Sequence, residues 1–532
     1  MASGKRQNFI SGAAVLAAAV AVTKVLGALY KIPLGNLLDR EGMAHFYVAY
    51  NIYSLLLVLS TAGLPLALSR IVAQADALGQ ENRKRRAFHV ALALFLALGL
   101  LGGGVMLLLP EQLAAVLHDT MAVPAIRALS PAVLCVCLAS AVRGYTQGQG
   151  NMRPTAASQV AESCGKLAVG LILVWYLLRR GESPQTVAAG AIAGVSAGSV
   201  LGLLTLVLFL AGHRSVRSGT DVPPSRASLA GKLLHAGIPI TIGAAGISFI
   251  TLLDQVLVMH TLQTALGLSE KAASLLYGEY TFGMTLFNLP VSFIYPITVS
   301  LMPAISAALA HCDRQGACRS TEGAFRLTAL LAFPAGAGLA VLARPVLDLL
   351  YPAVPATAAA AAGHLTVLGI ACIFACLMIV TGSVLQAYGH AYAPVISLLS
   401  GSTVKIAVTR LLVSDPGVGI WGAPIGTLCC YAAIALINLI LIRFVIPERP
   451  RCGRIFIRPA IAAAVMAALA CGVWHLLSDG LHMGRTATIL TILLAAAVYG
   501  LLCLWLGAVT QEDLKNLPKG ENLAKRLKIP LK

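Results

Sequence analysis

Long apolar segments separated by short polar ones run through the whole chain. A helix needs about 20 mostly apolar residues to cross the hydrocarbon core of a bilayer, and fourteen segments meet this requirement. They lie near residues 8–36, 44–68, 87–109, 121–145, 154–178, 185–211, 232–261, 277–308, 323–350, 359–388, 391–413, 418–447, 455–478 and 484–509. No alternating strand pattern recurs, and a spanning helix satisfies its own backbone hydrogen bonds. The pattern predicts an all-α polytopic membrane protein with about 14 transmembrane helices.

Composition and charge support this prediction. Of the 532 residues, 58% are hydrophobic and only 11% are charged, whereas about a quarter of a soluble domain is charged. A soluble enzyme is therefore excluded. The net charge of +18 alone would suggest nucleic acid, but its distribution follows membrane topology: with the N-terminus inside, inner segments hold 27 Lys and Arg and outer loops hold 8. We expect no nucleic-acid binding, two cytoplasmic termini and a first span that acts as its own targeting signal.

An internal repeat divides the chain. Shifted by 239, residues 147–169 overlie 386–408 with seven of 23 positions identical, including Lys166 and Lys405. A six-span shift preserves orientation, which predicts two parallel six-helix repeats around a central cavity. The expected parts are an N-lobe with helices 1–6 (1–211), a cytoplasmic linker (212–231), a C-lobe with helices 7–12 (232–447), two extra C-terminal helices 13–14 (448–510) and a basic cytoplasmic tail (511–532).

Five basic side chains lie where the membrane tolerates charge poorly. Lys24, Lys31, Lys166 and Lys405 fall within spans, and Arg70 closes the second span near the inner surface. Such a charge costs at least about 2.5–3.5 kcal/mol at the bilayer centre, so it normally faces a water-filled cavity or a partner. Lys24 and Lys31, two turns apart, project from one helix face. Cations outnumber carboxylates in the spans, which indicates an anionic substrate, and phosphate is well served by Lys and Arg.

Alternatives remain for several of these residues. Lys31 either lines the cavity or snorkels to the outer interface, and Arg70 either contacts substrate or anchors the helix at the inner interface. Glu162 and Lys166, four residues apart in the favourable order, either neutralise each other within one helix or act separately, with Lys166 facing the cavity and Glu162 serving in coupling or ion pairing. Asp254 either pairs with a lysine or binds a coupling cation. The cysteine and histidine spacing matches no zinc site or disulfide framework, so we expect no metal and no cofactor. The energy source is then a coupling cation, sodium or proton, or the membrane potential.

Three motifs resemble a known family. TKVLGALYKIPLG (23–35), YNIYSLLLVLSTAGLPLALSRIVA (50–73) and RGYTQGQGNMRPTAASQVAE (143–162) look like the stage V sporulation protein B group of polysaccharide transporters. That group belongs to the multidrug, oligosaccharidyl-lipid and polysaccharide flippase superfamily, close to bacterial lipid II flippases. In those flippases a basic residue before V-L-G helps to hold the pyrophosphate, and here that residue is Lys24. They place an Arg where this chain has Tyr30, with Lys31 one residue on.

The resemblance implies a transporter, not an enzyme. It would flip a polyprenyl-pyrophosphate-linked cell-wall precursor, lipid II or a related lipid-linked oligosaccharide, from the inner to the outer leaflet by alternating access. A cation-coupled multidrug exporter of the same superfamily, depending on Asp254 or Glu162, is the alternative; a membrane glycosyltransferase and a scaffold are less favoured. We expect a monomer in the plasma membrane of a bacterium. Its expected partners are the lipid-linked substrate, anionic lipids at the cytoplasmic face and cell-wall synthesis machinery.

Overall fold

The computed structural model describes residues 2–61, 63–212, 221–390, 392–448, 450, 452–480 and 483–508. The expected tail at 511–532 lies outside these residues, as does part of the expected linker. The chain forms two compact units, Met1–Gly278 and Glu279–Lys532, each with its own internal packing. The boundary falls within one helix, α10 (Glu270–Ser292).

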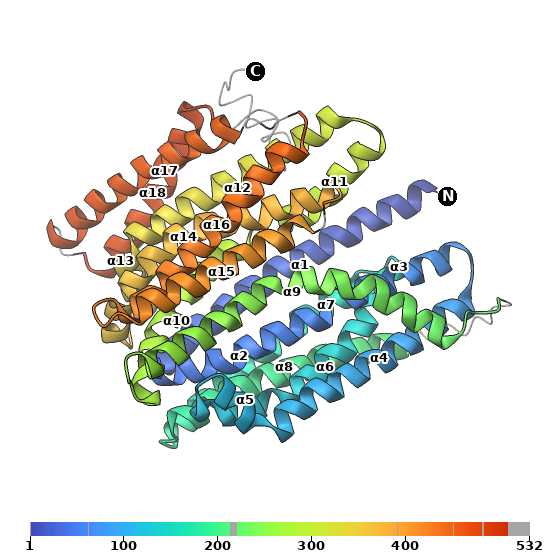
Figure 1. Cartoon of the computed structure of the whole chain (residues 1–532), viewed down its shortest axis with the longest axis horizontal. Helices are drawn as coiled ribbons and strands as arrows, with labels where there is room; N and C mark the ends of the chain where they lie inside the picture. The colour runs from blue at the N-terminus through green and yellow to red at the C-terminus, as the bar shows by residue number, and fades with distance from the viewer. Residues whose placement is uncertain are drawn as a thin grey trace. The chain divides into compact units, whose positions relative to one another are not determined.

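The first unit is a bundle of helices, drawn from blue to green in Figure 1. α7 packs against α1 and α8, α6 packs against α4 and α8, and α9 packs against α2 and α3. α9 begins inside the expected linker and lies with the first unit, although the repeat assigns it to the second half of the chain. The elements are α1 (Ala2–Leu37), α2 (Arg40–Thr61), α3 (Gly63–Ala77), α4 (Glu81–Leu108), α5 (Pro110–Val116), η1 (Thr120–Ala122), α6 (Val123–Gly148), α7 (Arg153–Arg179), α8 (Pro184–Gly212) and α9 (Arg226–Thr264).

The second unit repeats the order of the first. Its elements after α10 are α11 (Tyr295–Ala310), α12 (Arg314–Val341), α13 (Ala343–Leu350), α14 (Pro355–Ala387), α15 (Ala393–Val413), η2 (Gly419–Trp421), α16 (Gly422–Val445), α17 (Cys452–His475), the π-helical turn η3 (Leu476–Gly480) and α18 (Arg485–Trp505). α10 to α16 correspond in order to α2 to α8. The correspondence includes the short helices α5 and α13, which follow α4 and α12. α17 and α18 lie side by side in Figure 1, packed on α12 and α13.

Equivalent turns confirm the repeat. Two residues after the ends of α6 and α14 lies a glycine with a left-handed backbone, Gly150 at φ +76° and Gly389 at φ +90°. Each glycine donates its N–H to the carbonyl of the glutamine three residues earlier, over 2.9 Å from Gly150 to Gln147 and 3.0 Å from Gly389 to Gln386. Glycine adopts this conformation without a Cβ clash. The two halves therefore share their helix ends as well as their helix order.

The expected count of fourteen spans is approximate. Within the described residues, twelve helical segments are long and apolar enough to cross a membrane, and neither α9 nor α10 is among them. The single helix expected at 277–308 is interrupted: α10 ends at Ser292 and α11 begins at Tyr295. Pro290 precedes this break and Pro296 follows it, and a proline removes a backbone donor and clashes with the preceding turn.

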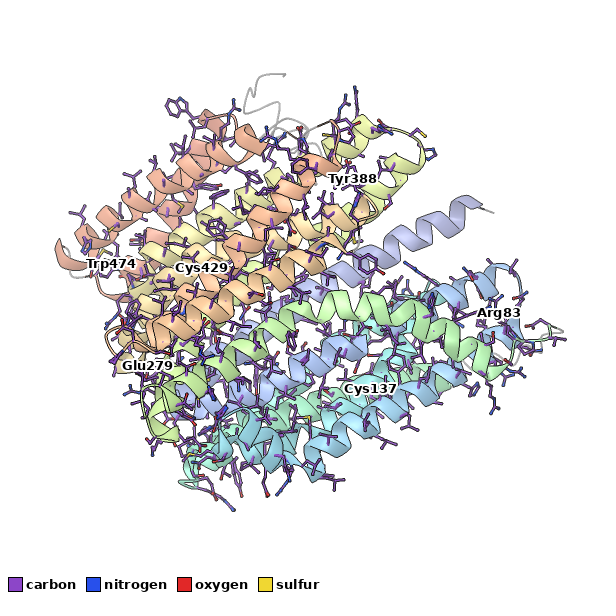
Figure 2. The ribbon with its side chains drawn as sticks, viewed as in Figure 1. Arg83, Cys137, Glu279, Tyr388, Cys429 and Trp474 are labelled. Atoms are coloured by element: carbon purple, nitrogen blue, oxygen red, sulfur yellow. The ribbon has the colours of Figure 1, made fainter. Side chains whose placement is uncertain are left out.

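The cysteines that the structure describes are free thiols. Cys137, labelled in Figure 2, lies in the interior of the first unit, with its Sγ 3.0 Å from the Ser60 hydroxyl. Such a residue packs as a small apolar side chain.

Glycines bring α7 and α8 into direct backbone contact. A Cβ at Gly194 would lie 2.2 Å from Cα of Gly170, and a Cβ at Gly198 would lie 2.4 Å from the carbonyl oxygen of Glu162. Small residues allow this close approach, and van der Waals packing drives helix association where lipid replaces water. This contact fixes α7, which carries Glu162 and Lys166.

A stability measurement tests this packing. Gly194→Ala places a methyl group against backbone and should destabilise the protein by about 1–3 kcal/mol, as overpacking does. In Gly104→Ala the added Cβ meets nothing within 4 Å, so this helix control should be neutral or slightly stabilising. Thermal unfolding of the two purified variants makes the comparison, and equal midpoints would contradict the close α7–α8 contact.

The residues that follow the undescribed part of the linker dock on the start of α4. The carboxylate of Asp221 accepts the backbone N–H groups of Asn82 and Arg83, each over 2.9 Å. Partial loss of hydration raises the pKa of Asp221, but these backbone hydrogen bonds outweigh it and lower the pKa below the usual carboxyl value. The cap is therefore present above the ordinary carboxyl pKa and is lost as the pH falls through the lowered pKa of Asp221.

Amide hydrogen exchange tests this cap. Asp221→Ala should speed exchange at the amides of Asn82 and Arg83 several-fold, because two donors in the first turn of α4 lose their acceptor. Asp313→Ala, which removes the equivalent cap on Gly316 at the start of α12, should leave α4 unchanged. Unaltered exchange at Asn82 in Asp221→Ala would show that the linker does not hold α4.

Candidate anion-binding site

Lysines of α1 lie against tyrosines of α2. The ammonium of Lys31 is 3.4 Å from the Tyr47 hydroxyl and lies over the rings of Tyr47 and Tyr50, 4.9 and 4.5 Å from their centroids. Lys24, two turns earlier on α1, is exposed and within electrostatic range of Lys31 and Tyr50. The two lysines thus share one helix face, and Lys31 lies over the rings of two tyrosines.

Lys166 of α7 approaches the same tyrosines. Its Nζ is 3.4 Å from the Tyr50 hydroxyl and lies 4.9 and 4.7 Å from the ring centroids of Tyr30 and Tyr50. The Tyr30 hydroxyl donates to the carbonyl of Ala191 on α8 over 2.8 Å, which fixes that ring. A cation over an aromatic face gains about 0.5–2 kcal/mol, the upper value applying when water is excluded. Tyr50 therefore joins Lys31 and Lys166 in one cluster.

Glu162 is engaged by α6 instead of by Lys166. Its carboxylate accepts hydrogen bonds from Arg143 over 2.9 Å and from the Tyr53 hydroxyl over 3.3 Å, and Arg143 also donates to Ser158 over 3.0 Å. Among the described residues Glu162 forms no ion pair with Lys166, so the intrahelical pair suggested by their spacing is wrong. The reason is geometric, because Arg143 reaches the carboxylate from the neighbouring helix. Lys166 keeps its charge uncompensated by Glu162.

The tyrosines are the part of the cluster that sequence reasoning missed. Tyr47, Tyr50 and Tyr53 are spaced by three residues in the segment YVAYNIY. That spacing places side chains on one side of a helix. This spacing is visible in the sequence, but tyrosines are neutral and common in apolar helices, so charge in a span does not point to them.

Arg70 and Asp254 lie apart from the lysine cluster on other helices of the first unit. Arg70 is exposed on α3, and within the described part of the chain no hydrogen bond or ion pair is recorded for it. Asp254 is buried on α9 at 2% exposure. Its neighbour Gln255 accepts a hydrogen bond from Asn51 of α2 over 2.8 Å. Asp254 itself lies within electrostatic range of Tyr277 on α10.

Lys405 occupies the repeat position of Lys166 but has a different environment. It is 2% exposed on α15, and its ammonium donates to the Thr427 hydroxyl over 3.0 Å. The Tyr280 hydroxyl lies 3.0 Å from the same Thr427 oxygen. As placed, Lys405 is a buried, bonded cation of the second unit, and contact with a substrate would require it to leave these partners.

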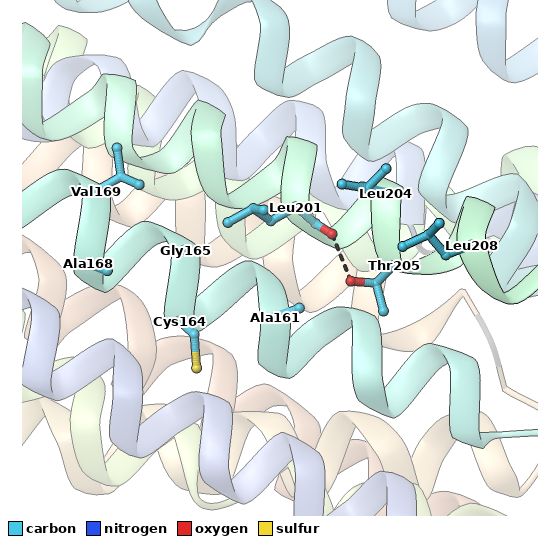
Figure 3. A pocket seen from close by; sticks show the side chains of 9 residues that line it. All are labelled: Ala161, Cys164, Gly165, Ala168, Val169, Leu201, Leu204, Thr205 and Leu208. Atoms are coloured by element: carbon cyan, nitrogen blue, oxygen red, sulfur yellow. Dashed lines mark hydrogen bonds between the residues drawn. The ribbon is translucent and has the colours of Figure 1, made fainter.

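An apolar groove of 420 Å³ is lined by residues of α7 and α8 (Figure 3). It runs between α7 and α8, and its polar lining atoms are few; the Thr205 hydroxyl in it already donates to the carbonyl of Leu201 over 2.8 Å. The groove suits hydrocarbon. An anion would have to bind at the lysine cluster.

The cluster is built to hold negative charge. Lys24, Lys31, Lys166 and Arg143 contribute four cations against the single carboxylate of Glu162, which Arg143 already neutralises. Phenol hydroxyls add neutral donors beside the ammonium groups. Among the described residues, no group of three or more His, Cys, Asp or Glu side chains is arranged to hold a metal ion. Ammonium groups and phenol hydroxyls in this arrangement are suited to bind an anion such as a phosphate ester.

Known proteins share this sequence pattern and fold. Residues 9–309 match the family described as polysaccharide biosynthesis protein. Over 543 residues the chain is 29% identical to the uncharacterized membrane protein YabM of Bacillus subtilis (strain 168), covering 98% of this chain and 97% of the relative. Over 527 residues it is 26% identical to stage V sporulation protein B of the same organism, covering 96% and 98%. These matches confirm the resemblance inferred from the three motifs.

A solved structure shows the same fold. The inward closed conformation of the lipid II flippase MurJ superposes with a TM-score of 0.66 at 13% identity, covering 93% of this chain and 98% of that one. At this identity the likeness establishes the fold alone.

A double-variant cycle tests the buried ion pair. Glu162→Gln leaves the Arg143 guanidinium, whose side chain is 10% exposed, without its counter-charge and should destabilise the protein by about 1–3 kcal/mol. Arg143→Met added to Glu162→Gln should recover part of that loss, because the unpaired cation is removed. Glu182→Gln, at an exposed position, is the control. Thermal unfolding of Glu162→Gln, Arg143→Met and the double variant gives the coupling energy, and strictly additive effects would contradict the pair.

Proposed function

The chain belongs to the polysaccharide biosynthesis protein family, and on that premise we propose that this multi-pass membrane protein is a flippase. Its substrate is a polyprenyl-pyrophosphate-linked cell-wall precursor, lipid II or a related lipid-linked oligosaccharide, which it moves from the inner to the outer leaflet by alternating access. The relative named stage V sporulation protein B and the fold shared with a lipid II flippase support this proposal.

The lysine cluster is the observation that carries the proposal. A pyrophosphate offers several negatively charged oxygens, and each hydrogen bond from an ammonium group to such an oxygen is worth about 1.5–3 kcal/mol. Lys24 is exposed, and Lys31 and Lys166 are partly so. Tyrosine rings and hydroxyls position Lys31 and Lys166 without cancelling their charge. These three lysines are the proposed headgroup ligands.

Arg70 and Lys405 have secondary roles in the proposal. Arg70 is exposed at the end of the unit that the sequence orients inward, where it would attract an anionic headgroup. Lys405 would contact the substrate after its ammonium group leaves the Thr427 hydroxyl. Glu162 and Asp254 are the proposed ion-pairing or coupling carboxylates, used with a coupling cation or with the membrane potential.

The charge of the cluster argues against the alternative, a cation-coupled multidrug exporter. A cationic drug would meet the ammonium groups of the cluster, and Glu162, the carboxylate on the same helix as Lys166, is already bound to Arg143 and Tyr53. The proposal further places the protein as a monomer in a bacterial plasma membrane, with both termini cytoplasmic. Anionic lipids and cell-wall synthesis machinery are its proposed neighbours.

Translocation by reconstituted protein tests the lysines. Lys24→Gln, Lys31→Gln and Lys166→Gln should each reduce lipid II translocation by about 10–100-fold, the kinetic equivalent of one lost charged hydrogen bond. The measurement is a leaflet-resolved assay in proteoliposomes, with thermal unfolding to show that each variant is folded.

Lys232→Gln is the matched control, since it removes the same charge from an exposed position on α9, and it should translocate like the unmodified protein. Translocation unchanged in all three cluster variants would remove the assigned role of the lysines. Efflux of cationic dyes without movement of lipid II would favour the exporter.

A further inference from the structure

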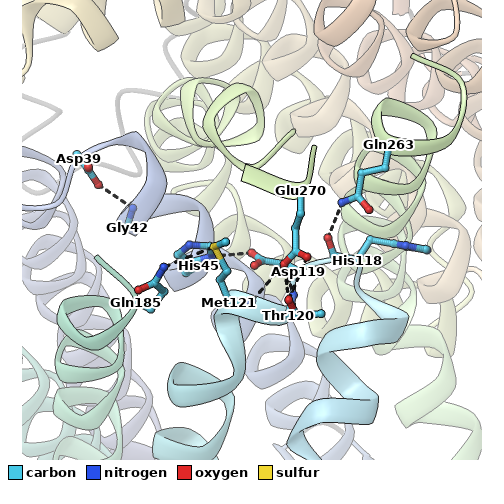
Figure 4. Close-up of polar contacts among 10 residues, drawn as sticks. All are labelled: Asp39, Gly42, His45, His118, Asp119, Thr120, Met121, Gln185, Gln263 and Glu270. Carbon is cyan, nitrogen blue, oxygen red and sulfur yellow. Dashed lines mark hydrogen bonds and ion pairs between the residues drawn. The ribbon is translucent and has the colours of Figure 1, made fainter. Parts of the chain in front are cut away.

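A fully buried histidine–aspartate pair lies at the other end of α2 from its junction with α3 (Figure 4). Nδ1 of His45 is 2.8 Å from Oδ2 of Asp119, and both side chains have 0% exposure. Within the described part of the chain, Nε2 of His45 and Oδ1 of Asp119 have no hydrogen-bond partner. Asp119 precedes η1 but makes no side-chain cap with it. The pair is therefore a buried acid–base couple whose remaining polar atoms are unsatisfied.

The loop that carries Asp119 is bonded to the helices that lead out of the first unit. The carboxylate of Glu270, at the start of α10, accepts the Thr120 hydroxyl over 2.8 Å and the Met121 N–H over 3.2 Å. Gln263 of α9 donates to the carbonyl of His118 over 2.7 Å. Because the chain passes into the second unit within α10, the loop links α2 to the element that connects the two units.

The ionisable surroundings of the pair carry more carboxylates than cations. α2 contributes Arg40 and Glu41, and Glu41 pairs with Lys271 of α10 over 3.4 Å. The other groups on the packed elements are His118 of the loop, His260 and Asp254 of α9, and Glu270 and Tyr277 of α10, while α5 and α6 add the exposed pair Glu111 and Arg127. α8 approaches through the neutral Gln185. This environment favours an added positive charge.

Charge balance gives the pair two states. With neutral imidazole and ionised carboxylate the pair carries one net negative charge in a dry interior, which is costly. Uptake of one proton by His45 produces an imidazolium–carboxylate pair with no net charge and a stronger hydrogen bond. Loss of that proton favours hydration of the pair and so loosens the contact between α2 and the Asp119 loop.

We propose that His45 and Asp119 form a proton-binding site whose occupancy controls the attachment of the Asp119 loop to α2, and that this site couples the transport cycle to protons. The coupling part rests on the proposed flippase function; the proton-binding part does not. One proton binds per pair. The bound proton fastens the Asp119 loop to α2. Through Glu270 and Gln263 it also holds the start of α10 and the end of α9 to α2.

The proton site is tested without transport, by ¹⁵N spectra of histidine-labelled full-length protein in nanodiscs. One imidazole signal, absent in His45→Gln, should change from the protonated to the neutral form as the pH is raised. In Asp119→Asn the pH dependence of this signal should differ from that of the unmodified protein, because the counter-charge is removed. His118→Gln, a variant of the same loop, should leave the signal in place. A His45 signal that keeps one protonation state throughout would overturn the proposal.

Coupling is tested in proteoliposomes with an imposed pH gradient. The unmodified protein and His118→Gln should move lipid II at rates that depend on the gradient, with proton flux reported by an internal pH dye. In Asp119→Asn, whose folding is checked by thermal unfolding, the ratio of rates with and without the gradient should fall to one.

The outcomes separate the two proposals. Lipid II movement that ignores the gradient in the unmodified protein would overturn coupling and leave the flippase function standing. No movement of lipid II under any gradient would overturn the flippase function and with it the coupling, while the histidine spectra still decide whether the pair binds a proton.

Discussion

The cost of placing charge in a medium of low dielectric constant governs how charged side chains are partnered in the first unit. An ammonium group there needs partners, and the kind of partner decides what the group can do. A carboxylate would cancel the charge of Lys31 or Lys166, whereas the faces and hydroxyls of Tyr30, Tyr47 and Tyr50 support it and leave it positive. Glu162, the carboxylate on the same helix as Lys166, is held by Arg143 on another helix. Separation of these two kinds of partner keeps the cluster cationic.

The two repeats share a framework but not a site. Gly150 and Gly389 lie just after corresponding helices with the same backbone conformation, and Lys166 and Lys405 follow at the same distance along the chain. Lys166 faces tyrosines of α2 and α1, whereas Lys405 is bound to Thr427 within the second unit. Duplication thus preserved the helices and their turns, while the side chains around the lysine diverged. The similarity of the repeats predicts fold and register but not function.

Features that depend on the order of residues along the chain could be predicted from the sequence. Apolar runs show the helices, the repeat shows the two halves, and the spacing of Lys24 and Lys31 shows their common face. Features that depend on which helices meet could not be predicted. Packing of α9 with the first unit is one example. Another is the choice of Glu162 between Lys166, four residues away, and Arg143, nineteen residues away; local spacing favours the former and helix packing the latter.

The glycine contact between α7 and α8 has a mechanical consequence. With no side chain between their backbones at Gly194 and Gly198, the two helices pack backbone to backbone, and we expect them to move together. At the start of this body Gln185 touches Met121, next to the histidine–aspartate pair; farther along, Ala191 accepts the Tyr30 hydroxyl. We therefore expect a displacement at η1 to be passed along α8 to the ring of Tyr30, which lies beside Lys166.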